Sequence, residues 1–576
     1  MRSISGTFHP AKSAFLSIAF VAAVYIITIT AIDTPGFWIT DNANKFIQME
    51  SITKSNFTDY SLSWPGQRID PDFEYNSVPS PFSVARDGKL FSVFSPVFAA
   101  VSTIPFGIFS YGGLYLLPLI SSIFMLAGLA KISRLLGLKN RAVHFTVIAC
   151  GLCTPVWFYS VVFWEHTIAV CLCIWGAYYF MRFLESASDR HLITGSILSA
   201  LGIWFRDELY LFCIVLVGVT LLYRKERRVK FALTAALTMT AVALPLWLFQ
   251  WKTIGQPFGF HLGSHLLSAE GISGHIFSRP QVFYNLIAAA HPVALVSLIV
   301  SAPFVIASIF NPKFSGYAFN LAVPAFALLG VISSLVALGG YVVAESPIVW
   351  MLRTNSLFTA SPFLILAFMR LKDSGSSDKA GVEPSATEWL RTAVLAYAGI
   401  YILAAPVMGS TGIHWGNRFL LVLYPMITVL AVSNLALWFG KIKKVVTPHT
   451  FAVALVILIS AAAQVYSINL LKTKKDFSGR LNTEIQRQPE KIVITNVWWV
   501  PQALFTEFHT KAMFYVSSPK QYDELVRTLA ENGYTSHIFA SQRPINETAP
   551  EVARIDDGGL NFFSLSFYLW MGTGKE

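Results

Sequence analysis

The sequence has little charge and little cysteine. Only 13% of its 576 residues are Asp, Glu, Lys or Arg, which is about half the share found in ordinary soluble proteins. This shortage excludes a water-soluble enzyme with a single buried core, and a disordered chain as well. The five cysteines all lie inside apolar runs, which excludes a protein held together by disulfides between polar loops. They are Cys150, Cys153, Cys171, Cys173 and Cys213.

Long apolar runs are abundant instead. Hydrophobic residues make up 54% of the chain and the mean hydropathy is +0.55. Runs of roughly 20 apolar residues are about long enough to cross a hydrocarbon core. The pattern therefore predicts a polytopic α-helical membrane protein with about thirteen transmembrane helices. The first, Ser13 to Ile32, is too long for a cleaved signal and predicts a retained anchor. The others are predicted at 113–130, 142–163, 167–184, 192–205, 208–223, 231–250, 287–310, 316–340, 355–370, 390–408, 419–439 and 449–470.

Basic residues orient this arrangement. The net charge is +11, and most Lys and Arg residues of the short loops fall on one side of the predicted membrane. Because cytoplasmic loops are enriched in Lys and Arg, that side is predicted to be the cytoplasm. The N-terminus then lies in the cytoplasm and the C-terminus lies outside. Since the loops account for the positive charge, no nucleic-acid partner is expected.

A cluster of charges interrupts the apolar segment from His191 to Tyr223. Arg206, Asp207 and Glu208 would lie near the middle of a single long span. Each charge at a bilayer centre costs about 2.5–3.5 kcal/mol. Two short helices joined by an outer turn avoid that cost, so the sequence predicts a hairpin.

Three segments differ from the spans. Within the predicted first outer loop (33–112), residues 33–91 are polar and carry eight carboxylates. Residues 92–110 are apolar with two prolines, which predicts a helix that lies on the outer surface or re-enters the membrane. Residues 373–389 are predicted to be a flexible linker.

The C-terminal segment, 471–576, is less apolar than the transmembrane part, 1–470. A helix is predicted at 518–534. Strands are predicted at 491–500, 511–516, 536–541 and 561–570. A strand–helix–strand order predicts a small extracytoplasmic α/β domain with partly parallel pairing.

Polar side chains gather at the outer ends of the predicted spans. A carboxylate base and cations that stabilise an anionic leaving group are what a group transfer needs. Each residue also has a plainer interpretation, as an interfacial side chain, a span boundary or a structural ion pair. The candidate residues are Asp41, Glu165, His166, Arg206, Asp207, Glu208, His414, Asn417 and Arg418.

Several motifs occur in a familiar order. Asp41 follows the first span, and DGKLFSVFSPV (87–97), TPVWFYSVVFWEH (154–166), FRDE (205–208) and GNRFLLVLYP (416–425) follow it. In this order the chain resembles the GT-C class of integral membrane glycosyltransferases, in the branch of the protein O-mannosyltransferases and the lipid A aminoarabinose transferase. The resemblance covers nearly the whole chain.

Two motifs depart from the pattern of that class. Ser95-Pro96-Val97 stands where the class has Pro-Pro-Gly, and Arg206-Asp207-Glu208 stands where it has Arg-Pro-Glu. The second departure leaves open whether Asp207 or Glu208 takes the position of the family carboxylate.

The resemblance implies transfer of a sugar from a polyprenyl-phosphate donor to a hydroxyl on a lipid, glycan or protein acceptor, with inversion. It implies Asp41 as general base and Glu165 as a second catalytic residue, which orients the acceptor or binds a divalent cation. No other cofactor is predicted. The substrate-binding residues implied are Lys89, His166, Arg206, Asp207, Glu208, His414, Asn417 and Arg418.

The sugar and the acceptor are not specified by the sequence. A bacterial inner membrane is the predicted location. The main alternative function is a multi-pass transporter or lipid flippase of envelope precursors, although no internal repeat supports it. A membrane transferase for phospho or acyl groups is a further alternative, for which no clustered metal site or activated nucleophile is visible.

Overall fold

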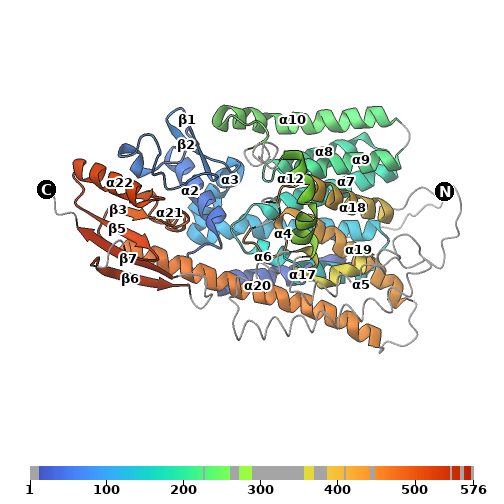
Figure 1. The fold of residues 1–576 in the computed structure, drawn as a ribbon. Coiled ribbons are helices and arrows are strands. Elements are labelled where there is room, and N and C mark those ends of the chain that lie inside the picture. The colour runs from blue at the N-terminus through green and yellow to red at the C-terminus, as the bar shows by residue number, and fades with distance from the viewer. Residues whose placement is uncertain are drawn as a thin grey trace.

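A helical body and a smaller α/β part at one end make up the chain (Figure 1). The computed structural model describes residues 12–224, 227–259, 271–288, 356–368, 386–407, 410, 412–440, 448–544, 548–557 and 564–571. All but the first two residues of the predicted span 287–310, the whole predicted span 316–340 and most of the predicted linker lie outside the described residues.

Five helices of the described residues are long and apolar enough to cross a membrane. They fall within Ala14–Ala31, Pro96–Leu135, His166–Ser186, Arg228–Ile254 and Thr450–Arg487. Two shorter apolar helices, α9 (Leu209–Tyr223) and α19 (Leu423–Phe439), accompany them. The protein is therefore a polytopic helical membrane protein, and the count of thirteen spans stays a prediction.

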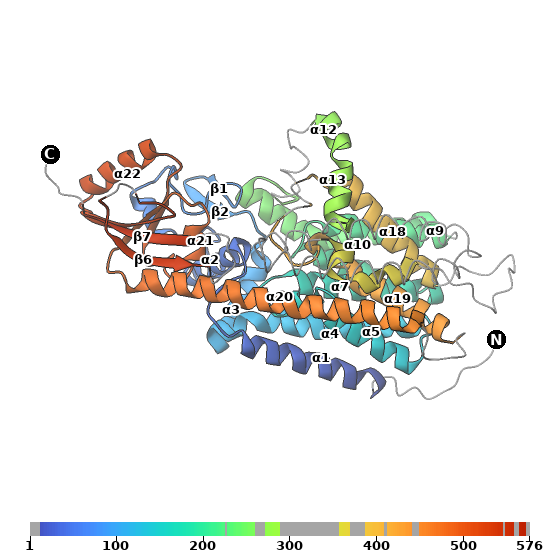
Figure 2. The same ribbon diagram turned by 60° about the horizontal axis from the view of Figure 1, so that its bottom comes forward.

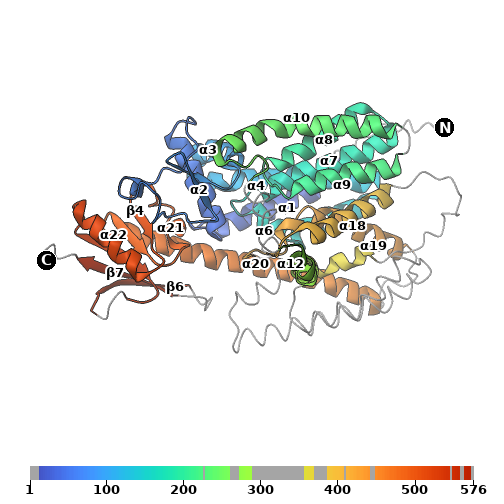
Figure 3. The same cartoon turned by 45° about the horizontal axis from the view of Figure 1, so that its top comes forward.

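The helices of the body pack along their lengths. In Figure 3, α7 (His166–Ser186), α8 (Asp189–Ile203) and α10 (Arg228–Ile254) lie side by side. The remaining helices of the body are α1 (Lys12–Ala31), α4 (Leu116–Leu135), α5 (Asn140–Leu152), α6 (Val156–Ser160), α12 (Gly271–Phe277), α13 (Arg279–Phe283), α17 (Leu357–Ala360) and α18 (Ala386–Ala404).

The charged hairpin is confirmed. Helices α8 and α9 are separate, and Arg206 lies in the turn between them. Two other predicted spans are wrong as continuous helices, because proline cannot donate a backbone hydrogen bond inside a helix. The predicted span 142–163 breaks at Pro155 into α5 and α6. The predicted span 355–370 breaks at Pro362 into α17 and a 3-10 helix, Pro362–Phe368.

Surface helices were predicted for the first loop, but one of its helices lies at a position that the sequence pattern did not indicate. Helix α2 (Thr40–Lys54) lies where a polar loop was expected, and eleven of its fifteen residues are buried. Its sequence lacks a clean apolar stripe of the kind that marks an amphipathic helix, because six of its eleven buried residues are polar. The rest of the loop forms a hairpin of β1 (Ser83–Arg86) and β2 (Lys89–Ser92) and then α3 (Pro96–Phe109). Helix α3 confirms the helix expected at 92–110, while its place in the membrane stays a prediction.

The C-terminal part is a five-stranded mixed sheet in the order β4-β3-β5-β7-β6. Strand β3 pairs in parallel with both β4 and β5, and β7 pairs antiparallel with β5 and β6. The predicted helix, four strands and partly parallel pairing are confirmed, although the strand predicted at 491–500 ends at Thr495, and β6 is additional. The elements are β3 (Ile492–Thr495), α21 (Val500–Ala503), β4 (Ala512–Tyr515), α22 (Pro519–Glu531), β5 (Ser536–Ser541), β6 (Glu551–Asp556) and β7 (Ser564–Met571).

One long helix joins the two parts. Helix α20 (Pro448–Arg487) runs from the body to the sheet without a break (Figure 2). The predicted boundary between residues 470 and 471 therefore falls inside a helix. The segment before α2 crosses α20 so closely that a Cβ on Gly479 would lie 2.8 Å from the Pro35 carbonyl oxygen. This contact sets where α2 begins.

Candidate functional site

Asp41 and Arg418 meet although they are 377 positions apart in the sequence. Arg418 Nη1 donates to Asp41 Oδ2 at 2.7 Å, and both side chains are largely buried. Asp41 lies in the first turn of α2, where the helix N-terminus favours a carboxylate. This contact agrees with the prediction that Asp41 and Arg418 lie close together.

A capped turn holds Arg418 in place. Arg418 begins a 3-10 turn (Arg418–Leu420), and the Asn417 side chain caps this turn by accepting from the backbone N–H groups of Phe419 and Leu420. Tyr424 Oη accepts from the Asn417 backbone N–H at 3.1 Å. Asn417 was predicted to bind substrate, and in the structure its oxygen supports the turn. The Arg418 guanidinium lies 5.3 Å from the Trp164 ring and 4.9 Å from the Phe419 ring.

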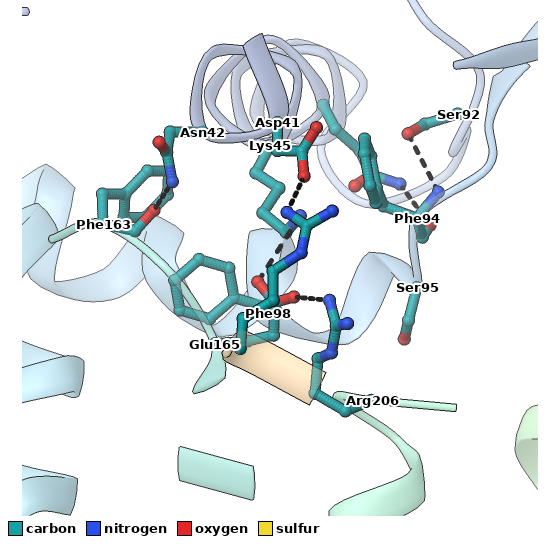
Figure 4. A network of polar contacts seen from close by, with 12 residues as sticks. Asp41, Asn42, Lys45, Ser92, Phe94, Ser95, Phe98, Phe163, Glu165 and Arg206 are labelled. Carbon is teal, nitrogen blue, oxygen red and sulfur yellow. Dashed lines mark hydrogen bonds and ion pairs between the residues drawn. The ribbon is translucent and has the colours of Figure 1, made fainter. Parts of the chain in front are cut away.

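Glu165 lies between two cations (Figure 4). Its Oε1 accepts from Arg206 Nη1 at 3.1 Å, and its Oε2 lies 3.5 Å from Lys45 Nζ. Arg206 Nε also donates to both carboxylate oxygens of Glu208, at 2.9 and 3.0 Å. The plainer interpretation of Arg206 as a member of a structural ion pair thus agrees with the geometry, and Glu208 rather than Asp207 is its near partner.

Lys45 is a member of this cluster that sequence reasoning missed. It lies four residues after Asp41 on α2, its side chain is 2% exposed, and its ammonium lies 3.6 Å from the centre of the Phe94 ring. Burial lowers the pKa of Lys45, while nearby Glu165 and Asp41 act in the opposite direction. The signal for Lys45 was the spacing D-x-x-x-K, which places both side chains on one face only if the segment is a helix.

Both predicted histidines are buried nearby. The His166 ring is tilted against the Trp164 ring, with 4.7 Å between the two ring centres. His414 Nδ1 contacts the Gly416 carbonyl oxygen at 2.5 Å, so this nitrogen carries a proton. A Cβ on Gly412 would lie near both His414 and Arg418, which places these two side chains together.

Lys89 lies elsewhere. It is on the β1–β2 hairpin, its side chain is half exposed, and its Nζ binds Asp59 at 2.6 Å. Lys89 does not line the cavity next to the cluster. That cavity is small and partly open, and its polar wall is made of Lys45, Ser95, Glu165, Arg206, Asp207 and Gln250.

A divalent cation does not fit Glu165 in this arrangement. Both of its oxygens already face cations, so a metal ion there would meet Lys45 and Arg206 at close range. Within the described ranges, no group of three or more His, Cys, Asp or Glu side chains could hold a metal ion. His261 and His265, a further His pair at helical spacing, lie outside the described residues.

The arrangement combines three carboxylates with three cations beside a cavity. Arg206, Arg418 and Lys45 carry positive charge, and Asp41, Glu165 and Glu208 balance it. Cations held in a buried place interact strongly with an entering anion. The site can therefore bind an anionic group and offer a carboxylate next to it.

No protein-family model and no curated protein matches the sequence. Among solved structures, the chain is similar in fold to the apo oligosaccharyltransferase of Archaeoglobus fulgidus, with a TM-score of 0.49, 12% identity, and 92% of this chain and 70% of that chain covered. It is also similar to ArnT from Cupriavidus metallidurans bound to undecaprenyl phosphate, with a TM-score of 0.45, 15% identity, and 97% and 98% covered. The apo state of that ArnT gives a TM-score of 0.45, 14% identity and the same coverage.

Proposed function

We propose that the protein is a membrane glycosyltransferase. It transfers a sugar from a polyprenyl-phosphate donor to an acceptor hydroxyl on the extracytoplasmic face of a bacterial inner membrane, with inversion. The observation that carries the proposal is the contact between Asp41 and Arg418, with Arg206 close by. A base and guanidinium groups in one buried cluster match the two demands of this reaction.

The reaction assigns a separate task to each charge. Asp41 takes the proton of the acceptor hydroxyl while the hydroxyl oxygen forms a bond to the anomeric carbon. The bond from that carbon to the phosphate oxygen breaks, and the electron pair leaves with the phosphate. Arg418 and Arg206 stabilise the charge that develops there by charge-assisted hydrogen bonds. General-base assistance contributes about 10²–10⁴ in rate.

The acceptor approaches from the side of Asp41. Helix α2 presents Asp41 in its first turn, next to the loop that carries His414 and Arg418. Glu208 neutralises Arg206 through two hydrogen bonds and takes the position that the Arg-Pro-Glu motif gives to its carboxylate. Asp207 lines the cavity and remains available to the sugar.

The test is transfer by the Asp41→Asn variant. Asparagine keeps the size of the side chain and removes the base, so we expect sugar transfer from a labelled polyprenyl-phosphate sugar to fall at least about 100-fold, while the protein still inserts and purifies as a monodisperse species. Full transfer by this variant would remove Asp41 from the mechanism.

The same preparation separates an enzyme from a transporter. In proteoliposomes, the wild-type protein should form a covalent product that contains the labelled sugar. Protein-dependent uptake of the label without any such product would contradict the proposal and favour the transporter or flippase.

A further inference from the structure

Lys45 has hydrogen-bond donors that the protein does not use. Its ammonium group has three N–H donors, and its nearest carboxylate oxygen, on Glu165, is 3.5 Å away. Among the residues that the structure describes, Lys45 Nζ makes no hydrogen bond, and its contact with Glu165 is an ion pair only. Burying such donors without acceptors is costly, so an acceptor that enters from outside the protein would be bound favourably.

The position of Lys45 directs these donors at a cavity. Lys45 lines this small, partly open cavity together with Arg206. The Phe94 ring covers the ammonium on one side at 3.6 Å, and Glu165 lies on another. Figure 4 shows Lys45 reaching from α2 toward Glu165 and Arg206. An anion in the cavity would therefore meet Lys45 and Arg206 together.

We propose that Lys45 binds the phosphate of the polyprenyl-phosphate donor, the task that sequence resemblance assigns to Lys89. This inference rests on the proposed function for the identity of the lipid. A phosphate group presents several oxygens that accept charge-assisted hydrogen bonds. It supplies the acceptors that Lys45 Nζ lacks, while Lys89 is already bound to Asp59 on the surface hairpin.

Glu165 then acts as a positioning residue. Its two oxygens hold Lys45 and Arg206 on either side, at 3.5 and 3.1 Å. It keeps two like charges close together in a buried place until the anion arrives, and it does not touch the reacting atoms. Loss of Glu165 should therefore raise the KM for the donor more than it lowers kcat, which loss of a second catalytic base would not do.

The test measures binding of undecaprenyl phosphate and undecaprenol to the full protein in nanodiscs. The wild type should bind the phosphate more tightly than the alcohol. Lys45→Met should weaken binding of the phosphate by about 10- to 100-fold, the usual loss for a hydrogen bond between charged groups, and leave binding of the alcohol unchanged. Lys54→Met, in the last turn of the same helix, is the matched control and should keep the wild-type affinity.

Lys89→Met decides between the two lysines. It should bind undecaprenyl phosphate as tightly as the wild type does, and a loss in Lys89→Met with wild-type affinity in Lys45→Met would overturn the proposal. If Lys45→Met does not fold, the charge-balanced double variant Lys45→Met/Glu165→Gln takes its place with the same expected loss. Wild-type affinity in that variant would equally overturn the proposal.

Two further outcomes separate this site from the reaction. Competition by inorganic phosphate as strong as by undecaprenyl phosphate would overturn the lipid as the source of the anion. Binding of undecaprenyl phosphate that depends on Lys45, in a protein that transfers no sugar to any acceptor, would support the anion site and contradict the proposed function.

Discussion

At the scale of single residues, the cluster is a set of buried charges that depend on one another. Glu165 is 3% exposed and faces two cations, and Arg206 in turn binds Glu208. Removing one member of a buried pair leaves an uncompensated charge, which usually costs more than the pair itself contributes. The pairing of these buried charges therefore matters for the stability of the protein as well as for its chemistry.

Glu165→Gln should destabilise the protein through Lys45. The amide keeps the shape but leaves the Lys45 ammonium without its nearest counter-charge, at a cost of about 3 kcal/mol. The double variant Lys45→Met/Glu165→Gln should cost less than the sum of the single variants, with a coupling of about 1–3 kcal/mol. Thermal unfolding of the four proteins in detergent measures this cycle.

A surface pair provides the control for that cycle. Glu524 lies 3.6 Å from Lys520 on α22, and both side chains are well exposed. Because exposed pairs contribute little, Glu524→Gln should unfold at the wild-type temperature. Additive costs in the Lys45–Glu165 cycle would contradict the coupling of the two residues.

At the scale of elements, α2 connects the site to the C-terminal sheet. Its first turn holds Asp41 and its last turns meet the segment that leads to β4. There His509 Nε2 lies 3.5 Å from Glu50 Oε2, and His509 Nδ1 contacts the Ser63 carbonyl oxygen at 2.8 Å. Since Nδ1 must donate to that carbonyl, neutral His509 presents a lone pair to Glu50.

Burial shifts both groups of this contact. The pKa of Glu50 is raised from 4.5 to about 7 by burial, against the opposing effect of Lys54. The pKa of His509 is lowered from 6.5 to about 4 by burial, and Lys54 acts in the same direction there. The Glu50 contribution to stability is present at low pH and is lost as the pH rises from 4.5 through 7. The His509 contribution is present above 6.5 and is lost as the pH falls toward 4. Between about pH 4.5 and 6.5 the two slopes cancel.

Single variants should expose each slope. His509→Gln leaves Glu50 alone, so its unfolding temperature should fall as the pH rises from 5 to 7. Glu50→Gln leaves His509 alone, so its unfolding temperature should fall as the pH drops from 6.5 to 4.5. Each slope corresponds to about 1.4 kcal/mol per pH unit. Thermal unfolding at a series of pH values measures both, and two variants with the pH profile of the wild type would contradict this account of the contact.

At the scale of the whole molecule, α20 sets the distance between the helical body and the sheet. It is one helix of 40 residues, and the segment from α1 to α2 crosses it at two glycines, Gly36 and Gly479. Lys475 Nζ donates to the Ile32 carbonyl oxygen beside this crossing. A side chain at either glycine would push the start of α2 away from α20, and Asp41 would move with it.

Gly479→Ala should therefore destabilise the protein although alanine favours helices. Its Cβ would lie 2.8 Å from the Pro35 carbonyl oxygen and 2.9 Å from Thr34 Cγ2. Overpacking of this kind costs about 1–3 kcal/mol, which exceeds the stabilisation that alanine gives over glycine in a helix. Transfer activity should fall as well. Gly218→Ala on α9 is the matched control, because its Cβ meets nothing within 4 Å. It should be as stable as the wild type or more stable, and equal behaviour of the two variants would contradict the crossing.

Sequence alone determined the parts of this protein that depend on local pattern. Apolar runs predict the long helices, the charges at Arg206 to Glu208 predict the α8–α9 hairpin, and alternating apolar residues predict the strands of the sheet. Each of these features depends on which residues of one short segment are apolar and which are polar, so the sequence of that segment is enough to predict it.

Only the tertiary structure decided the site. Polar side chains make up six of the eleven buried residues of helix α2, so its existence and the place of Lys45 depend on partners far away in the sequence. Lys89 belongs to a motif and still lies at the surface, because Asp59 binds it there. Asp41 and Arg418 meet only because α20, the turn at Asn417 and the crossing at Gly479 bring their segments together. A contact between charges 377 positions apart is set by how distant segments pack together, and the sequence of one segment does not specify that packing.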